Sequence, residues 1–284
     1  MRYRFLRFPE GKPKAVTFSY DDGIRQDIRF SELLTSYNLK ATFNLNSQDL
    51  RGARGLQTEE VKRYILDKGH EVAIHGYNHR AEGRLRPIDA IRDILDCRIE
   101  LENDFGMIIR GMAYPDTGIC HFSTGIDYEK IKSYLTDLDI AYSRTLGGDN
   151  QRFELPNDWH AWMPSAHHSN PQIMEYIDKF LALDLSPKAY CAGRAPRLFY
   201  IWGHSYEFDK NDGWNLIESI CQKLANQDDI WYATNIEIHD YVEAYNSLIY
   251  SADETMVYNP GIVTIWFDVD GQLYEIKPGE TLKL

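Results

Sequence analysis

The feature that most constrains the fold is a regular alternation of short apolar runs, rich in β-branched and aromatic residues, with longer amphipathic stretches. The apolar runs cover residues 15–20, 41–45, 71–75, 108–114, 140–143, 198–202 and 230–233. Between most of them, apolar side chains recur at the three- and four-residue spacing of a helix. About seven strand-helix units in series predict an α/β fold with a parallel sheet and crossover helices.

The C-terminal tail departs from this alternation. Residues 261–269 alternate with a period of two, and Asp270-Gly271 is a hairpin signal that leads into a further run at residues 273–276. We therefore expect a barrel-sized α/β domain over residues 1–254 and a small antiparallel β appendage over residues 255–284.

Charge and hydropathy narrow the classes of partner. The formal net charge of -12 argues against nucleic acid, whose phosphates require clustered Lys and Arg. No run approaches the roughly 20 apolar residues of a membrane-spanning helix. The N-terminus has charge interleaved through it, unlike a secretory signal. We expect a cytoplasmic protein without a membrane span, unless a signal was trimmed from the chain; the oligomeric state is left open.

Acids and histidines stand where several of the predicted strands end. Asp21 and Asp22 follow the first strand, His75 ends the third, and His204 ends a late one. Parallel strand-helix folds place their active sites at the carboxyl ends of the strands, so these side chains are expected to converge. Taken alone, Asp21-Asp22-Gly23 is also ordinary turn chemistry.

A second histidine, His79, lies four residues after His75, so both imidazoles can face a common centre. A single pair at this spacing also occurs on solvated helix faces. With one carboxylate it becomes a two-histidine, one-acid set of the type that binds catalytic zinc and leaves a position for water. The second carboxylate would then be free to act as a base.

Two stretches together resemble the first and second motifs of the polysaccharide deacetylase family, the NodB-homology domains of carbohydrate esterase family 4. They are Thr17-Phe18-Ser19-Tyr20-Asp21-Asp22-Gly23 and His75-Gly76-Tyr77-Asn78-His79. The family's fold is an irregular (β/α) barrel of about seven parallel strands, which agrees with the number of strand-helix units counted above.

The resemblance also implies roles for individual residues. It makes Asp21 the general base, and Asp22, His75 and His79 the ligands of a divalent metal. His204, in Tyr200-Ile201-Trp202-Gly203-His204, would be the general acid. Zinc is the expected metal, with cobalt, nickel and manganese as alternatives.

The chain departs from the family's pattern in three places. Gly76 stands where the second motif has Ser or Thr, so a hydrogen bond that fixes the loop is expected to be missing. Met112-Ala113-Tyr114-Pro115-Asp116 keeps the proline of the third motif and lacks its arginine, which orients the catalytic Asp in the family. The fourth motif has no clear match. Arg144, after the strand at 140–143, could supply the missing cation; the alternative is a surface arginine.

Residues 144–170 form an irregular segment rich in Trp, His and Pro that is too long for an idle connection, and we expect it to face the substrate. Within it, Trp162 could form an apolar wall against a sugar ring and His168 could contact the substrate. The alternative for Trp162 is a packing role, and the alternatives for His168 are a solvated pair with His167 or a pair that supports the site without touching the substrate. Tyr114 sits where the family uses a backbone amide as an oxyanion donor, so its amide rather than its side chain is expected to matter.

The resulting hypothesis is a metal-dependent hydrolase that removes acetyl groups from a sugar or polysaccharide. One alternative is a catalytically weak or inactive carbohydrate-binding barrel that retains the metal site, which the weakened third and fourth motifs favour. Another is a metal hydrolase acting on phosphate esters, against which the sequence shows no second metal-binding cluster. The sequence does not choose between N-acetyl and O-acetyl substrates, nor does it give their length.

Overall fold

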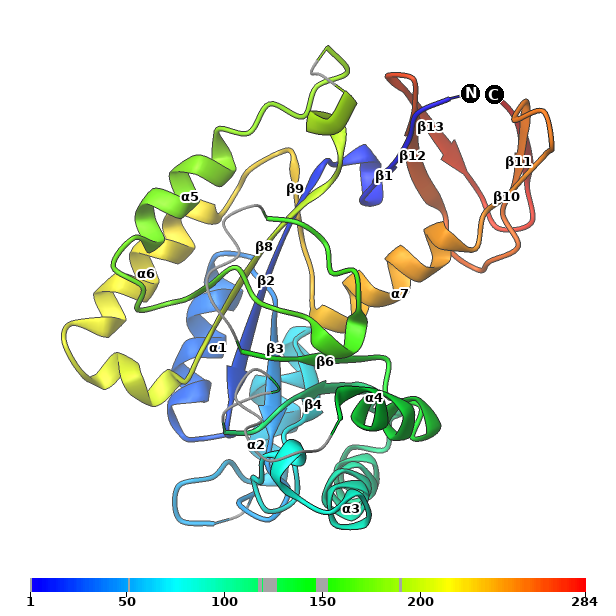
Figure 1. Ribbon diagram of the computed structural model, residues 1–284. Coiled ribbons are helices and arrows are strands. Elements are labelled where there is room, and N and C mark those ends of the chain that lie inside the picture. Colours follow the sequence, from blue (N-terminus) through cyan, green and yellow to red (C-terminus); the bar gives the residue numbers. More distant parts are fainter. Residues whose placement is uncertain (1, 51, 117–118, 120–126, 147–152, 189–190) are drawn as a thin grey trace.

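A computed structural model describes residues 2–50, 52–116, 119, 127–146, 153–188 and 191–284. Its main sheet runs in the order β6-β5-β4-β3-β2-β8-β7, with β9 paired to the start of β2, and every ladder in it is parallel. The strands are β2 (Lys14–Asp21), β3 (Ala41–Leu45), β4 (Glu71–Ile74), β5 (Gly111–Ala113), β6 (Tyr142–Arg144), β7 (Ala166–His167), β8 (Arg197–Gly203) and β9 (Ile230–Tyr232). The expected α/β fold with a curled parallel sheet is confirmed (Figure 1).

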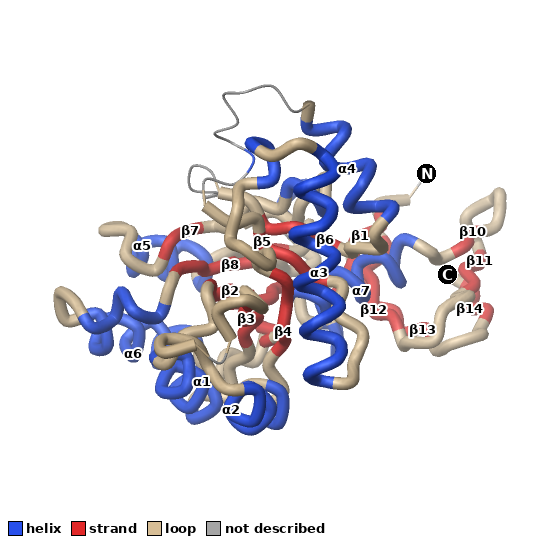
Figure 2. Tube along the Cα trace, turned by 90° about the horizontal axis from the view of Figure 1, so that it is seen from below, coloured by secondary structure: helices blue, strands red, loops and turns tan. Residues whose placement is uncertain are grey.

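Helices connect these strands, and all but the last of them cover the outside of the curled sheet (Figures 1 and 2). They are α1 (Gln26–Ser36), α2 (Thr58–Tyr64), α3 (Pro87–Phe105), α4 (Tyr128–Asp137), α5 (Ile173–Leu181), α6 (Gly213–Leu224) and α7 (Asn235–Asn246). Their ends follow local signals: Gly106 in a left-handed conformation ends α3, and Thr234 with Glu237 forms a capping box for α7. Among the described residues, none of the helices has both the length and the apolar character to cross a bilayer.

The segment expected to be wholly irregular contributes to the sheet. Its residues 153–170 include the short strand β7, which pairs with β8, while residues 147–152 lie outside the described ranges. Just before β7, Trp162 makes a parallel bridge to Arg144 of β6, and the N–H of Ser165 donates to Tyr200 O of β8 at 2.8 Å. The segment thus spans the gap between β6 and β8, the two sides of the barrel.

The appended part is built from two antiparallel sheets. One has the order β1-β12-β13 and the other β10-β11-β14. The strands are β1 (Arg4–Arg7), β10 (Ile249–Tyr250), β11 (Met256–Tyr258), β12 (Ile265–Val269), β13 (Gln272–Ile276) and β14 (Thr281–Lys283). The Asp270-Gly271 turn joins β12 to β13 as expected. The sheets also recruit β1 and β10, which lie outside residues 255–284.

Two clusters of buried side chains hold these layers together. The larger one fills the space between the outer face of the sheet and α1 to α6. The second joins the barrel interior to α7 and the appended sheets, and includes Phe8, Tyr200, Tyr241 and Phe267. Because the second cluster draws on both parts of the chain, the appended sheets pack on the amino-terminal end of the barrel and leave its carboxyl mouth open.

Candidate active site

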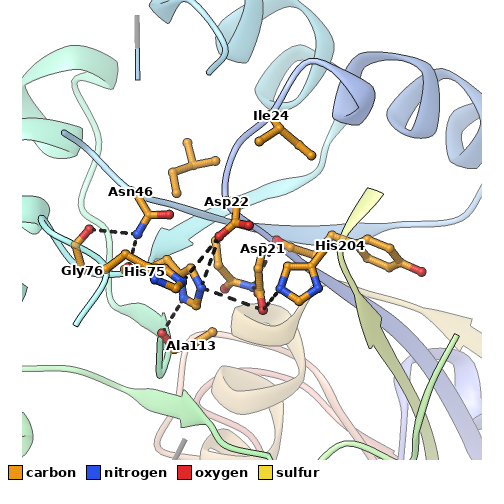
Figure 3. A network of polar contacts seen from close by, with 12 residues as sticks. Asp21, Asp22, Ile24, Asn46, His75, Gly76, Ala113 and His204 are labelled. Atoms are coloured by element: carbon orange, nitrogen blue, oxygen red, sulfur yellow. Dashed lines mark hydrogen bonds and ion pairs between the residues drawn. The ribbon is translucent and has the colours of Figure 1, made fainter. Parts of the chain in front are cut away.

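The carboxyl ends of neighbouring strands bring the acids and histidines together. In the sheet, Asp21 of β2 lies opposite Asn44 of β3, and Tyr20 lies opposite Gly203 of β8. The next residues along the chain therefore meet at one mouth. Figure 3 shows Asp21, Asp22, His75 and His204 pointing toward one another there.

Asp22, His75 and His79 form a group whose ligand atoms all lie within 4.8 Å of one another. Asp22 Oδ1 lies 3.7 Å from His75 Nε2 and 3.6 Å from His79 Nε2. These separations are close to those between ligands of one tetrahedral zinc ion, whose bonds are about 2.0–2.2 Å long. The donor set therefore suits a divalent metal.

The proton on His75 supports the same interpretation. Its Nδ1 lies 2.9 Å from Ala113 O, a group that only accepts hydrogen bonds, so Nδ1 carries the proton and Nε2 presents a lone pair to Asp22 (Figure 3). Burial of the ring lowers the pKa of His75, which keeps it neutral. A neutral imidazole with a bare, inward-facing nitrogen is the form that binds a metal.

Four residues at this mouth have left-handed backbone. Asp22 has φ 85°, His79 has φ 53°, and Gly23 and Gly76 have φ 64° and 78°. For residues with a side chain, such values cost of order 1 kcal/mol or more and persist only where the surroundings enforce them. At Asp22 and His79, the surrounding contacts therefore hold a strained backbone that carries two of the metal-ligand candidates.

The Gly76 departure has a structural explanation. A Cβ at Gly76 would lie 2.6 Å from Asp93 Oδ2, and its positive φ also favours glycine. Asp93, on α3, accepts from the N–H groups of Tyr77 and Asn78 at 3.0 and 2.9 Å, and from Asn78 Nδ2 at 2.8 Å. Asp93 thus fixes the loop that a Ser or Thr after His75 was expected to hold.

The partners of Asp21 differ from those of the adjacent Asp22. Arg144 Nη2 donates to its Oδ2 at 2.6 Å and Asn44 Nδ2 donates to its Oδ1 at 2.8 Å. Arg144 is 1% exposed and its guanidinium lies 4.8 Å from the centre of the Trp202 ring. The arginine after the strand at 140–143 is therefore not on the surface; it contacts the candidate base, as the substitution hypothesis requires.

These contacts set the charge of Asp21. Burial alone would raise the pKa of its carboxyl, but the Arg144 guanidinium, with His75 and His204, outweighs burial and holds that pKa below its usual value. His75 Nε2 and His204 Nε2 each lie 3.9 Å from Asp21 Oδ2. Because both carboxylate oxygens already accept hydrogen bonds, Asp21 is less available as a metal ligand than Asp22.

His204 follows β8 and precedes the short 3-10 helix η7 (Ser205–Asp209). Burial lowers the pKa of its ring, but Glu207 and Asp21 outweigh burial and raise that pKa above its usual value.

Asp27, on α1, connects the two sides of the mouth, since it accepts a hydrogen bond from the N–H of Ile24 at 2.9 Å and one from Ser205 Oγ at 2.6 Å.

The structure bears on three expectations about the substrate side. The N–H of Tyr114 donates to Arg144 O at 2.9 Å, so it is not free to stabilise an oxyanion, and the phenol is buried against His160 O. Trp162 is 1% exposed and packs edge-on against Tyr142 and Tyr200, which leaves no ring face for a sugar. His168 is 3% exposed and stacks on Tyr20, so it supports the site from behind.

An open cleft of about 920 Å³ leads away from the metal-ligand group. Asp22 and His79 line one end of it, and Arg25, Arg54 and Tyr206 line other parts. A smaller cavity of about 390 Å³ lies far from this mouth, between Arg7, Pro187 and Leu273. A cleft of several hundred Å³ next to candidate ligands is the usual form of a small-molecule site, so substrate would enter from this side.

Comparisons with known proteins agree with this architecture. Residues 9–121 match the family model described as polysaccharide deacetylase. No curated protein matches the chain. The matched residues include the two motif stretches and the three metal-ligand candidates, and end before Arg144 and His204.

Several solved structures share the fold. A Mycobacterium smegmatis protein assigned as a polysaccharide deacetylase superposes with a TM-score of 0.57 at 17% identity, over 85% of this chain and 94% of that one. A Pseudomonas aeruginosa protein with a similar assignment gives 0.55 at 14% identity, over 82% and 92%. The peptidoglycan deacetylase PdaC from Bacillus subtilis gives 0.51 at 16% identity, over 83% and 94%.

Proposed function

We propose that this chain, whose residues 9–121 match the polysaccharide deacetylase family model, is a metal-dependent hydrolase that removes acetyl groups from a sugar or polysaccharide. The observation that carries the proposal is the division between two adjacent carboxylates. Asp22 faces the two histidines, whereas Asp21 is bound by Arg144 and Asn44.

Asp22, His75 and His79 would hold the metal, with zinc as the first choice and cobalt, nickel or manganese as alternatives. A bound divalent ion of this kind polarises a carbonyl and lowers the pKa of a bound water toward about 7. Ala113 O contributes indirectly, because it fixes the proton on the far nitrogen of His75.

The remaining steps belong to residues of the chain. Asp21, ionised at neutral pH, takes a proton from the attacking water as its oxygen bonds to the acetyl carbon. Arg144 keeps that carboxylate charged and oriented. As the bond from the acetyl carbon to the sugar nitrogen or oxygen breaks, His204 donates a proton to the leaving atom. Acetate and the free amine or alcohol are the products.

Carbohydrate binding without turnover remains the second candidate, and one observation favours it. The amide of Tyr114, expected to stabilise the oxyanion, is hydrogen-bonded within the sheet. A missing donor of this kind costs on the order of 100-fold in turnover in other enzymes. The proposal leaves open whether the acetyl group is on nitrogen or oxygen and how long the sugar is. For the compartment, a cytoplasmic sugar substrate is our prediction.

Acetate release tests the two candidates. The zinc-loaded protein is assayed on a panel of N- and O-acetylated sugars, beside Asp21→Asn and the exposed control Asp137→Asn. Hydrolysis predicts metal-dependent acetate release that falls at least about 100-fold in Asp21→Asn and is unchanged in Asp137→Asn. Stoichiometric metal binding without acetate release from any substrate would support the binding role.

A further inference from the structure

We propose that Glu207, held in place by His167, is a positioning residue that orients His204 for proton donation. The inference rests on the proposed function, because it names the groups that orient the general acid. Glu207 lies on η7, three residues after His204, and no family motif quoted above includes Glu207 or His167.

Both the backbone and the ring of His204 lie against one oxygen of Glu207. The N–H of His204 donates to Glu207 Oε2 at 3.3 Å, and His204 Nδ1 lies 3.7 Å from the same oxygen. The opposite ring nitrogen, Nε2, faces Asp21 Oδ2 at 3.9 Å. His204 Nδ1 is buried and has no partner within hydrogen-bond distance among the described residues, so the Glu207 carboxylate beside it favours a proton there, while Nε2 faces the mouth, where a leaving group would stand.

Glu207 is in turn held from β7. The N–H of Ser169 donates to His167 Nδ1 at 3.2 Å, so in the neutral ring that nitrogen is bare and the proton sits on Nε2. His167 Nε2 lies 3.1 Å from Glu207 Oε2 and can only donate to it. A chain of contacts therefore runs from the Ser169 backbone through His167 and Glu207 to His204.

The neighbouring packing keeps this chain of contacts short. A Cβ at Gly203 would collide with the His168 ring, so glycine before His204 allows β7 to approach β8 closely. His168 Nε2 lies 3.4 Å from Glu207 Oε2, and burial lowers the pKa of His168 to about 3, which keeps that ring neutral. Burial raises the pKa of Glu207, but the neighbouring His167 and His204 outweigh burial and lower that pKa, so the carboxylate is charged.

A competing role for the same group is a second metal site, which the sequence did not reveal because its residues come from two distant segments. The ligand atoms of His167, His204 and Glu207 lie within 4.8 Å of one another. Metal binding would need a bare Nε2 on His167, whereas the Ser169 N–H places the proton there. The tautomer therefore favours positioning, and metal binding becomes an outcome of the test.

Kinetics of Glu207→Gln, His167→Ala and their double variant test the proposal, with Glu175→Gln on the exposed face of α5 as a matched control. We expect kcat to fall at least about 10-fold in Glu207→Gln, with KM within about two-fold and one zinc equivalent retained. The alkaline limb of kcat should move to lower pH, because loss of the negative charge makes protonated His204 harder to keep. His167→Ala should add little in the Glu207→Gln background, since it acts through Glu207.

A second measurement is independent of turnover. Nitrogen-15 spectra of the zinc-free protein should show the neutral His204 ring protonated at Nδ1, and Glu207→Leu should lose this preference while Glu175→Gln keeps it. Unchanged kcat in Glu207→Gln, an unchanged His204 tautomer in Glu207→Leu, or two zinc equivalents in wild type and one in His167→Ala would each overturn the proposal. If wild type releases no acetate, the proposed function fails and the spectra still decide the positioning role.

Discussion

Two buried carboxyl groups in the same barrel differ in protonation at neutral pH, because their hydrogen-bond donors differ in charge. Asp21, 2% exposed, ends β2 at the carboxyl mouth; Glu71, 7% exposed, begins β4 in the barrel interior. Glu71 accepts from Tyr142 Oη, Thr42 Oγ1 and the N–H of Ile236 at 2.7, 2.7 and 2.9 Å. All these donors are neutral, and burial raises the pKa of Glu71 to about 7.

Asp21 differs because one of its donors is a cation. The Arg144 guanidinium outweighs burial and lowers the pKa of Asp21, although the depth of burial is similar. Burial therefore does not decide whether a carboxyl in this barrel is charged; the charge of its partner does. At the mouth, Asp21 is ionised and can accept a proton. In the barrel interior, Glu71 is partly protonated and accepts a hydrogen bond from the N–H of Ile236, which fixes the start of α7.

Removing the Arg144 guanidinium should abolish the difference in protonation between Asp21 and Glu71. Of the changes considered, we expect this one to have the largest effect on activity. In Arg144→Ala, Asp21 would remain buried without its ion pair, so we expect acetate release to fall at least about 100-fold and the protein to lose several kcal/mol of stability. Arg144→Lys keeps the positive charge but loses the planar arrangement of donors of the guanidinium. It should therefore recover part of the activity and part of the stability. Acetate release and urea unfolding measure the two effects.

Near-normal turnover in Arg144→Ala would sink the role given to this arginine. Arg197→Ala serves as the control, because that guanidinium donates to Ala195 O and Pro196 O, away from the mouth.

Glu71→Gln should remove the titrating carboxyl of the barrel interior and leave Asp21 at the mouth unchanged. A carboxyl whose pKa is raised from 4.5 to about 7 in the folded protein stabilises it fully below pH 4.5, and this contribution is lost as the pH rises through 7. The size of the shift corresponds to on the order of 3 kcal/mol. Wild type should therefore lose more unfolding free energy between pH 5 and pH 8 than Glu71→Gln does.

Urea unfolding at several pH values measures this difference, and comparison with the variant cancels the other titrating groups. Parallel pH curves for the two proteins would mean that Glu71 is already ionised in the folded state.

A smaller effect on stability is expected from substitutions at glycines with left-handed backbone. One such glycine lies at the mouth and another lies in an ordinary turn. Gly76 and Gly69 both have φ 78°, but a Cβ at Gly69 would meet nothing within 4 Å, whereas one at Gly76 would meet Asp93 Oδ2 at 2.6 Å. Both alanine variants should lose about 1 kcal/mol to the left-handed conformation. Only Gly76→Ala should also weaken zinc binding, by displacing the loop that carries His75 and His79.

Calorimetric zinc titration of the two variants checks this expectation. Equal zinc affinities would show that the contact with Asp93 does not hold the loop in its metal-binding form.

The sequence predicted the parts of this site that depend on strand ends. Asp21, Asp22, His75 and His204 terminate apolar runs, and a parallel sheet aligns such ends at one mouth. Arg144 was considered because the chain lacks the arginine of the family's third motif and because it follows another strand. The convergence of these side chains needs only the order of strands and helices, whereas their roles come from the family resemblance.

The errors concern register and packing. Tyr114 was given a free amide, but the pairing of Ala113 with Arg144 in β5 and β6 uses that N–H. For Trp162, a wall against a sugar ring and a packing role were both left open, and the segment before β7 turns inward to bridge β6 and β8, which fits the packing role. Asp93 and Asn44 were missed, although Asn44 is a polar residue inside an apolar strand and could have been noticed. Asp93 lies on a distant helix, where only the fold reveals its partners.

Zinc titration of Asp21→Asn beside Asp22→Asn tests the central division of roles most directly, because the two variants remove the same charge one residue apart. We predict that Asp21→Asn binds one zinc with nearly wild-type affinity, since Asp21 is held by Arg144 and Asn44. Asp22→Asn should lose at least about 10-fold in affinity, because its carboxylate faces His75 and His79. The reverse order of affinities would contradict the assignment of Asp22 as ligand and Asp21 as base.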